Sequence, residues 1–187
     1  MTAIDTLKQA FNEHQAVITA LEPLLPEIAA VADVMRNCLA NGGKILLFGN
    51  GGSAADSQHI AAEIVGRYKK ERRGLPAIAL TTDTSILTSV GNDYGFDFIF
   101  SRQVEALCTP ADVVIGFSTS GNSRNVVLGI EKAREIGAIT VAMTGGTGGK
   151  LANLCDHALT MPTSDTPRIQ EAHILIGHSL CDLVEAD

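Results

Sequence analysis

Hydrophobic residues in the first part of the chain recur at the spacing of amphipathic helices. Two runs of this kind, residues 7–21 and residues 28–39, are separated by a short segment that contains two prolines. Apolar side chains at every third or fourth position place one face of a helix against a core or another subunit. The second run ends at Asn41 and two glycines, a typical helix C-cap. We therefore predict two helices that form an N-terminal helical extension over residues 1–41.

From Lys44 onward, the pattern changes to short apolar runs that alternate with amphipathic segments. We predict five strands, with helices after the first, third and fourth: Ile45–Phe48, Ala77–Leu80, Val113–Phe117, Ile139–Met143 and Ala158–Met161. Strands that are apolar throughout and separated by helices are typical of a parallel sheet covered on both faces. The predicted fold class is α/β, a doubly wound five-stranded parallel sheet of the flavodoxin-like kind, in a single domain of residues 1–187. Ligands of such a sheet bind beyond the carboxyl ends of the strands.

Composition and charge narrow the range of partners. The formal net charge is −7, whereas a nucleic-acid-binding protein needs a basic face that neutralises phosphates. No apolar run approaches the length of a membrane span, and the N-terminal residues lack the basic and apolar segments of a signal peptide. Four scattered cysteines without a CxxC pair suit reduced thiols better than a disulfide framework. We expect a cytoplasmic protein with no nucleic-acid partner and no membrane partner.

One basic run departs from the acidic average of the chain. Its cations are Arg67, Lys69, Lys70, Arg72 and Arg73. Such a run fits the solvated end of a helix, where cations complement the carbonyl dipole. It also fits a surface that draws an anionic substrate toward a site, and the sequence leaves both interpretations open.

The loop after the first predicted strand is rich in glycine. It reads Gly49-Asn50-Gly51-Gly52-Ser53, and a helix is predicted to start near Ala54. Glycines allow positive φ angles and a close approach of the backbone to a ligand, and a helix start attracts anions. The spacing matches neither the dinucleotide fingerprint nor the Walker loop. A simple tight turn explains this loop about as well as a binding site does.

The loop after the third predicted strand is rich in hydroxyl groups. It reads Ser118-Thr119-Ser120-Gly121-Asn122-Ser123 and precedes a predicted helix, Asn125–Ile136. Ordinary N-capping needs only one hydroxyl, and this loop has four. Hydroxyls, backbone amides and a helix dipole together can hold a phosphate group without a lysine. The loop therefore predicts a phosphomonoester site.

Candidate acid–base and metal-ligating residues lie on two predicted helices. His59 and Glu63 are four positions apart on one helix face, so they suit one metal ion, one shared substrate or a surface hydrogen bond. Gln170 and His178 lie on a later helix. Eight residues of straight helix separate them by about 12 Å along the axis, which is awkward for ligands of one ion.

The start of that later helix is marked by Thr166 as the predicted N-cap and Pro167 at the first helical position. His173 points about 140° away from His178 on the helix, and we interpret it as a structural residue. Earlier in the chain, the segment from Asn92 to Gly95 reads only as a turn.

Four long stretches carry a resemblance to a known family. They are GNGGSAADSQHIAAE from Gly49, LTTDTSILTSVGNDYGF from Leu80, FSTSGNS from Phe117 and TPRIQEAHILIGH from Thr166. On these stretches the chain resembles the phosphoheptose isomerases of the SIS (sugar isomerase) domain family over nearly its whole length. The resemblance implies an SIS fold, a homotetramer with active sites at subunit interfaces, and one bound divalent metal ion per subunit, commonly zinc.

The resemblance also implies roles for individual residues. The metal ligands would be His59, Glu63, Gln170 and His178, and the acid–base pair would be Glu63 and His178. Gln170 is included on the resemblance alone. The substrate contacts would be Asn50, Gly51, Gly52, Ser53, Glu63, Asn92, Asp93, Ser118, Thr119, Ser120, Ser123 and Gln170.

The implied activity is an aldose–ketose isomerisation. It would convert D-sedoheptulose 7-phosphate to D-glycero-D-manno-heptose 7-phosphate through an enediol, in heptose biosynthesis for a cell-surface polysaccharide. Because a glutamate bound tightly to zinc is a poor base, Glu63 is open to the role of base, ligand or both. The alternatives are an isomerase of another sugar phosphate, and a non-catalytic SIS module that binds a sugar phosphate or a protein.

Overall fold

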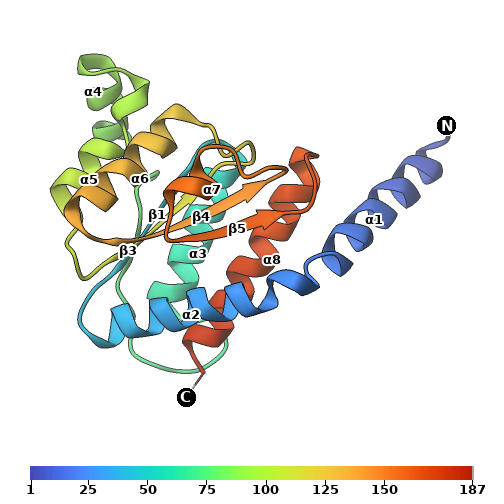
Figure 1. The fold of residues 1–187 in the computed structure, drawn as a ribbon, viewed down its shortest axis with the longest axis horizontal. Helices are drawn as coiled ribbons and strands as arrows, with labels where there is room; N and C mark the ends of the chain where they lie inside the picture. Colours follow the sequence, from blue (N-terminus) through green and yellow to red (C-terminus); the bar gives the residue numbers. More distant parts are fainter. Residues whose placement is uncertain (187) are drawn as a thin grey trace.

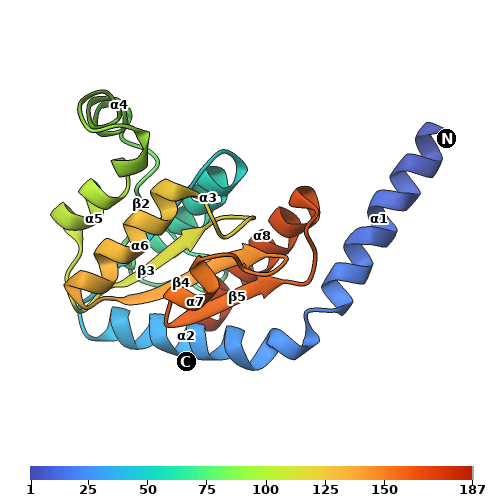
Figure 2. The same ribbon diagram turned by 45° about the horizontal axis from the view of Figure 1, so that its top comes forward.

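Five parallel strands form the centre of the molecule, in the order β2-β1-β3-β4-β5 (Figures 1 and 2). The structure is a computed structural model and describes residues 1–186. The strands are β1 Ile45–Gly49, β2 Ala77–Ala79, β3 Val113–Phe117, β4 Ile139–Gly145 and β5 His157–Met161. Each lies where the sequence pattern predicts it, with ends that differ by no more than two residues. This strand order is the flavodoxin-like one, so the predicted fold class is confirmed.

Helices cover both faces of the sheet (Figures 1 and 2). One face carries α2 Leu25–Ala40, α3 Gly52–Val65 and α8 Thr166–Val184. The other face carries α5 Ser101–Leu107 and α6 Arg124–Ile136, flanked by α4 Thr84–Asp93 and the single turn α7 Leu151–Leu154. The helical elements at the amino-terminal side of α2 are α1 Ala3–Thr19 and the 3-10 turn η1 Glu22–Leu24, and a second 3-10 turn, η2 Phe96–Phe98, follows α4.

The strands are apolar throughout because both of their faces are buried. On β1, Ile45 and Leu47 belong to the core beneath α2, α3 and α8, whereas Leu46 and Phe48 belong to the core beneath α5 and α6. All four are fully buried. Successive side chains of a strand point to opposite faces, so a doubly covered strand has no polar positions left.

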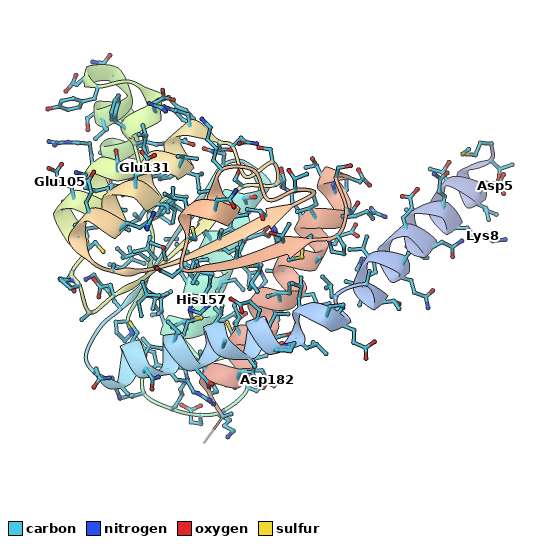
Figure 3. All side chains as sticks on the ribbon, viewed as in Figure 1. Asp5, Lys8, Glu105, Glu131, His157 and Asp182 are labelled. Atoms are coloured by element: carbon cyan, nitrogen blue, oxygen red, sulfur yellow. The ribbon has the colours of Figure 1, made fainter. Side chains whose placement is uncertain are left out.

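The two N-terminal helices have different surroundings. Helix α2 packs on the sheet through buried residues such as Val31 and Met35. Helix α1 instead extends away from the body, as the labelled Asp5 and Lys8 show (Figure 3). Three apolar residues at helical spacing on α1, Ile4, Leu7 and Phe11, are 63%, 57% and 71% exposed. Within one chain, therefore, the apolar stripe of α1 is largely uncovered.

Helices α3 and α8 lie side by side and run in the same direction. A Cβ atom added to Gly52 would lie 2.4 Å from the side-chain nitrogen of Gln170, and one added to Gly177 would lie 2.4 Å from Cδ1 of Ile60. Residues near the start of α3 thus face the start of α8, and residues later in α3 face residues later in α8. The two glycines allow this close approach, which places the candidate residues of both helices on facing surfaces.

The helices between β2 and β3 were not predicted. The segment from Asn92 to Gly95 is not an isolated turn, because Asn92 and Asp93 are the last two residues of α4. Threonine, serine and glycine give this stretch a low helix propensity. Its helix forms because the side chain of Asp83 caps it by accepting from the amide of Ile86, and because Leu87 packs against the core.

Two predicted helix starts also need correction. Asp165, rather than Thr166, occupies the N-cap of α8, so Thr166 and Pro167 are its first helical residues. Helix α3 begins at Gly52, slightly earlier than the predicted start near Ala54. The helix predicted after the fourth strand is only the single turn of α7.

The basic run forms a loop that follows α3. The guanidinium of Arg72 donates to the carbonyl oxygens of Glu63 at 3.1 Å and Gly66 at 3.4 Å, so this cation does complement the end of the helix. The four cysteines form no disulfide within residues 1–186. No helix within residues 1–186 is both long and apolar enough to cross a bilayer.

Candidate functional site

The glycine loop and the serine loop meet at the carboxyl edge of the sheet, after the neighbouring strands β1 and β3. The strand order reverses between these two strands, and this is where ligands bind in a flavodoxin-like sheet. A reciprocal pair of side-chain hydrogen bonds joins the glycine loop to the start of α6, directly after the serine loop: Asn50 donates to Asn125 at 2.9 Å, and Asn125 donates back to Asn50 at 2.9 Å. Asn125 is only 3% exposed, so the pair fixes the glycine loop relative to the start of α6.

The glycine loop owes its shape to the absence of side chains. Gly51 has a φ of +57° at the N-cap of α3, a conformation that glycine adopts without strain. Gly52 lies against the side chain of Gln170, with no room for a Cβ atom. Ser53 is buried, and its carbonyl oxygen accepts a hydrogen bond from the Ser57 hydroxyl. The loop thereby presents the positive end of α3 to the edge of the sheet.

The hydroxyls of the serine loop do not serve as an ordinary helix cap. Ser123 occupies the N-cap of α6, yet its side chain makes no capping bond within the described chain. Instead its Oγ lies 2.9 Å from Oγ of the buried Ser118, which also accepts from the Ser123 amide. Oγ of Ser120 accepts from the amide of Asn122. Capping therefore does not account for this set of hydroxyls.

A hollow opens beside the serine loop at the ends of β3 and β4. Polar side chains from three loops line it together with two glycines: Thr119, Ser120, Gly145, Gly146, Thr147, Ser164 and Thr166. The loop depends on Gly121, whose φ is +65° and where an added Cβ atom would lie 1.9 Å from the carbonyl oxygen of Gly148. The arrangement offers hydroxyl and amide groups to a small anionic ligand.

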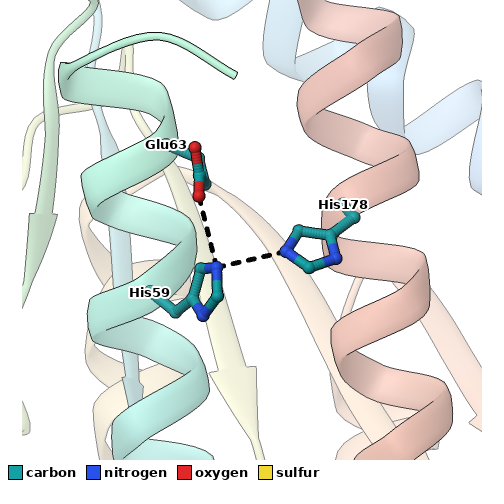
Figure 4. Close-up of side chains that lie close together, drawn as sticks. All are labelled: His59, Glu63 and His178. Carbon is teal, nitrogen blue, oxygen red and sulfur yellow. Dashed lines mark hydrogen bonds and ion pairs between the residues drawn. The ribbon is translucent and has the colours of Figure 1, made fainter. Parts of the chain in front are cut away.

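His59, Glu63 and His178 converge between α3 and α8 (Figure 4). Nε2 of His59 lies 3.1 Å from Nε2 of His178 and 3.2 Å from Oε1 of Glu63. One ligand atom from each of the three residues lies within 4.8 Å of the others. Two imidazole nitrogens and a carboxylate oxygen, open to solvent on one side, form a donor set used by catalytic zinc sites. The residues present therefore fit a divalent cation.

Gln170 lies apart from these three residues. Its side chain packs against Gly52 at the start of α3, whereas His178 faces His59 about two turns further along the same helix pair. Within one chain, Gln170 is thus a neighbour of the glycine loop. Its role as a metal ligand stays a prediction from the resemblance.

Asn92 and Asp93 lie at the exposed end of α4, where Asn92 donates to Asp93 at 2.8 Å. Helix α4 borders a second hollow, which the glycine loop shares through Asn50 and Gly51 and to which α4 contributes Leu87. A part in substrate binding for Asn92 and Asp93 remains a prediction.

His173 is a structural residue, as its orientation on the helix predicts. It is fully buried, and its Nε2 lies 3.1 Å from the carbonyl oxygen of Thr144. Burial lowers the pKa of His173 to about 4, against a smaller opposing effect of this hydrogen bond.

Two residues near the site were not anticipated from the sequence. Asn125 was overlooked because an asparagine at a helix start usually caps it, whereas here it holds Asn50. Asp56 lies one turn before His59, on the face of α3 that also carries Glu63. Its Oδ2 is buried and has no hydrogen-bond partner among residues 1–186, and burial raises its pKa to about 6 against an opposing effect of His59. In the sequence, the helical spacing of Asp56, His59 and Glu63 could have indicated that all three share one face of α3.

Comparison with known proteins places the chain in a family. The family model described as SIS domain matches residues 10–145. A phosphoheptose isomerase of Aquifex aeolicus is 58% identical over 183 residues, which cover 97% of this chain and 96% of that protein. Phosphoheptose isomerase 1 of Campylobacter jejuni is 54% identical over 182 residues, which cover 97% of this chain and 98% of that protein.

Solved structures agree with these sequence relatives. The phosphoheptose isomerase of Neisseria gonorrhoeae superposes with a TM-score of 0.94 at 46% identity, covering 98% of this chain and 99% of that one. The enzyme of Francisella tularensis gives a TM-score of 0.95 at 40% identity, covering 99% of both chains. Since fold, length and sequence all correspond, the chain belongs to the phosphoheptose isomerases of the SIS domain family.

Proposed function

We propose that this chain catalyses the isomerisation of D-sedoheptulose 7-phosphate to D-glycero-D-manno-heptose 7-phosphate, in heptose biosynthesis for a cell-surface polysaccharide. The observation that carries the proposal is the convergence of His59, Glu63 and His178 on facing helices. Helix α3, which provides two of them, starts directly at the glycine loop. A sugar phosphate held at the edge of the sheet would have its reactive end near these groups.

In this proposal the serine loop holds the phosphate. Ser118, Thr119, Ser120 and Ser123 would donate hydroxyl hydrogen bonds, and the start of α6 would add its dipole. The hydroxyls of Ser118 and Ser123 already lie 2.9 Å apart, so little reorganisation is needed before both face one anion. The glycine loop and Ser53, with Asn92 and Asp93, would complete the substrate contacts.

A divalent ion, in our proposal zinc at one per subunit, would be held by His59, Glu63 and His178, with Gln170 added from the resemblance. When bound, such an ion polarises a carbonyl and its neighbouring hydroxyl as a Lewis acid. The buried and unpartnered carboxylate oxygen of Asp56, on the same helix face, adds negative charge beside this donor set.

The proton transfers fall to Glu63 and His178. Glu63 would remove a proton from C1 of the ketose, and His178 would protonate the oxygen on C2, which gives the enediol. Loss of the proton from the C1 hydroxyl and return of a proton to C2 then give the aldose. Positioned acids and bases of this kind contribute about 10²–10⁴-fold each. Glu63 cannot be a tight ligand and a free base at the same moment, so substrate arrival must loosen it, or it has only one role.

The proposal includes self-association to a homotetramer with sites at subunit interfaces. The uncovered stripe of Ile4, Leu7 and Phe11 on α1 supports it, because an apolar helix face of this kind is typical of an interface with a second copy. The four free thiols support a cytoplasmic location.

The direct test is to incubate the purified protein with D-sedoheptulose 7-phosphate and to follow formation of the heptose 7-phosphate. Fructose 6-phosphate and ribulose 5-phosphate serve as matched ketoses of other lengths. Turnover of the seven-carbon sugar alone supports the proposal. Faster turnover of a shorter ketose would make the chain an isomerase of another sugar phosphate. Binding without turnover of any of them would make it a non-catalytic module.

A further inference from the structure

The carboxylate of Glu185 joins the end of α8 to the loop that follows α3. Oε1 of Glu185 accepts from the amide of Tyr68 at 2.6 Å, and Oε2 accepts from the amides of Lys69 at 2.8 Å and Lys70 at 2.9 Å. The Glu185 side chain is only 1% exposed. A buried carboxylate that accepts three consecutive backbone amides fixes the path of that loop.

Tyr68, whose amide donates to Glu185, also lies against the candidate site. Its ring stacks on the imidazole of His178, with centroids 5.4 Å apart and planes inclined by 20°. The ring of His59 meets the same imidazole edge-on at 4.9 Å. His178 is therefore in contact with an aromatic ring on its face and with another along its edge, which restricts its rotation.

A second branch of the network reaches Glu63. The guanidinium of Arg72 lies 2.8 Å from Oε1 of Glu185 and donates to the backbone carbonyl of Glu63 at 3.1 Å. The Arg72 side chain is 16% exposed. One carboxylate is thus connected to His178 through Tyr68 and to the backbone of Glu63 through Arg72.

We propose that Glu185 and Tyr68 are positioning residues for the isomerisation, which set the orientation of the His178 imidazole toward the substrate and Glu63. This inference rests on the proposed role of His178 in the reaction. Neither residue belongs to the cluster of possible ligands, so in this proposal they act through the groups that they hold.

The charge of Glu185 suits a permanent clamp, by which we mean the contacts of its carboxylate with the amides of Tyr68, Lys69 and Lys70 and with Arg72. Burial by itself would raise the pKa of this carboxyl, but the amides of Lys70, Tyr68 and Lys69, together with Arg72, lower it to about 2. The carboxylate is therefore ionised at neutral pH.

Four variants test the proposal in the metal-loaded protein: Tyr68→Leu, Tyr68→Phe, Glu185→Gln and the control Asp182→Asn. Asp182 lies one turn before Glu185 and forms an exposed ion pair with Lys69, so the control disturbs the same loop outside the clamp. For Tyr68→Leu and Glu185→Gln we expect kcat to fall by about 10-fold to 100-fold with KM changed by less than about 3-fold, because a misplaced catalytic group slows chemistry more than binding. Tyr68→Phe keeps the ring and should restore kcat, and Asp182→Asn should match the wild type.

A His178→Gln variant distinguishes failure of the proposed positioning role from failure of the proposed function. If His178→Gln is inactive while folded Tyr68→Leu and Glu185→Gln retain full kcat, the clamp is wrong and the proposed function stands. If His178→Gln is fully active, the proposed role of His178 fails, and the clamp fails with it. A kcat for Tyr68→Phe as low as that for Tyr68→Leu would also overturn the role of the ring.

A spectroscopic test covers the case in which these variants lose stability. The chain has two tyrosines and no tryptophan, so Tyr68 is the only strong emitter in a Tyr94→Phe background. Saturating Co²⁺ should quench this emission because the ion would be held by the imidazole on which Tyr68 stacks. Adding Glu185→Gln should weaken the quenching. Equal quenching with and without the Glu185 carboxylate would overturn the proposal.

Discussion

The Nε2 atoms of His59 and His178 lie 3.1 Å apart, although 119 positions separate the two residues in the sequence. The parallel pairing of α3 and α8 brings them together, and Gly177 permits the close helix contact beside them. The geometry of the candidate site therefore depends on the spacing of two helices as much as on the ligand residues.

Gly177→Ala should disturb this spacing. The added Cβ would lie 2.4 Å from Cδ1 of the buried Ile60, so either the Ile60 side chain or the two helices must shift, at a cost of about 1–3 kcal/mol in unfolding free energy. We expect weaker metal binding in a chelator competition, together with lower activity. The double variant Gly177→Ala/Ile60→Val removes the clashing methyl and should recover part of both. Gly91→Ala is the control: an added Cβ at this helical glycine would lie 3.8 Å from Cγ2 of Ile99, an ordinary contact, so metal affinity should be unchanged.

The variant Glu63→Gln distinguishes a role of Glu63 as the catalytic base from a role as a metal ligand. The amide keeps the shape and the hydrogen bonding of the carboxyl group but removes its basicity. If Glu63 is the base, kcat falls by about 10²-fold or more while sugar phosphate still binds. Metal content, measured by elemental analysis, and deuterium incorporation at C1 are followed alongside. A parallel loss of metal and activity that added zinc restores would assign Glu63 as a ligand only, and wild-type turnover would exclude both roles.

Ser118→Ala and Ser120→Ala should raise KM for the sugar phosphate by about 10-fold or more each, because each lost hydroxyl leaves a phosphate oxygen without a donor. Ser118→Ala should have the larger effect, since its Oγ also orders Ser123 through two contacts. Ser89→Ala, on exposed α4, serves as the control. Unchanged KM values for both loop variants would move the phosphate to another part of the edge of the sheet.

His173 should make the protein less stable in acid. Its folded pKa of about 4 lies below the ordinary value of 6.5, so the unfolded chain binds the proton more readily. The unfolding free energy therefore falls as pH drops from about 6.5 toward 4, by up to about 3 kcal/mol. Denaturant titrations at several pH values measure this slope. His173→Gln should flatten it and His14→Gln should retain it; an identical slope in both would assign acid sensitivity to other groups.

Phe11→Asp should weaken self-association. Phe11 is 71% exposed on the apolar stripe of α1, and a carboxylate there would be costly to bury against a second copy. Light scattering should show a smaller assembly with reduced activity. Gln9→Asp places the same charge on the opposite side of α1 and should leave the assembly intact. An active wild-type monomer in the same measurement would refute shared sites.

The fold could be predicted from the local hydrophobic pattern, because that pattern shows which residues are buried. Five residues of β1, apolar from Ile45 onward, leave little alternative to a strand covered on both faces. Helix α4 escaped prediction because its threonines, serines and glycine favour no helix, and its stability comes from a cap and from tertiary packing.

The site was predicted less completely, since it depends on long-range geometry. Hydroxyl density indicated the serine loop, whereas helical spacing made His59 and Glu63 only candidates. The resemblance grouped them with Gln170 and His178, and the closeness of His59 to His178 became visible only once the neighbouring helices were known. Asp56 was overlooked because a lone aspartate on a helix usually faces water, and only the packed structure shows that one of its carboxylate oxygens is buried.

The reciprocal amide pair depends on Asn50, and the sequence Asn50-Gly51 is of the kind that deamidates readily. Asn50 precedes Gly51, the neighbour that least shields an asparagine from attack by the following backbone nitrogen. Deamidation would replace the donating NH₂ of Asn50 with an acceptor oxygen, so one of the two 2.9 Å bonds would become a contact between two acceptors. The glycine loop and the start of α6 would then lose their shared anchor, so we expect a stored sample to lose activity as Asn50 deamidates.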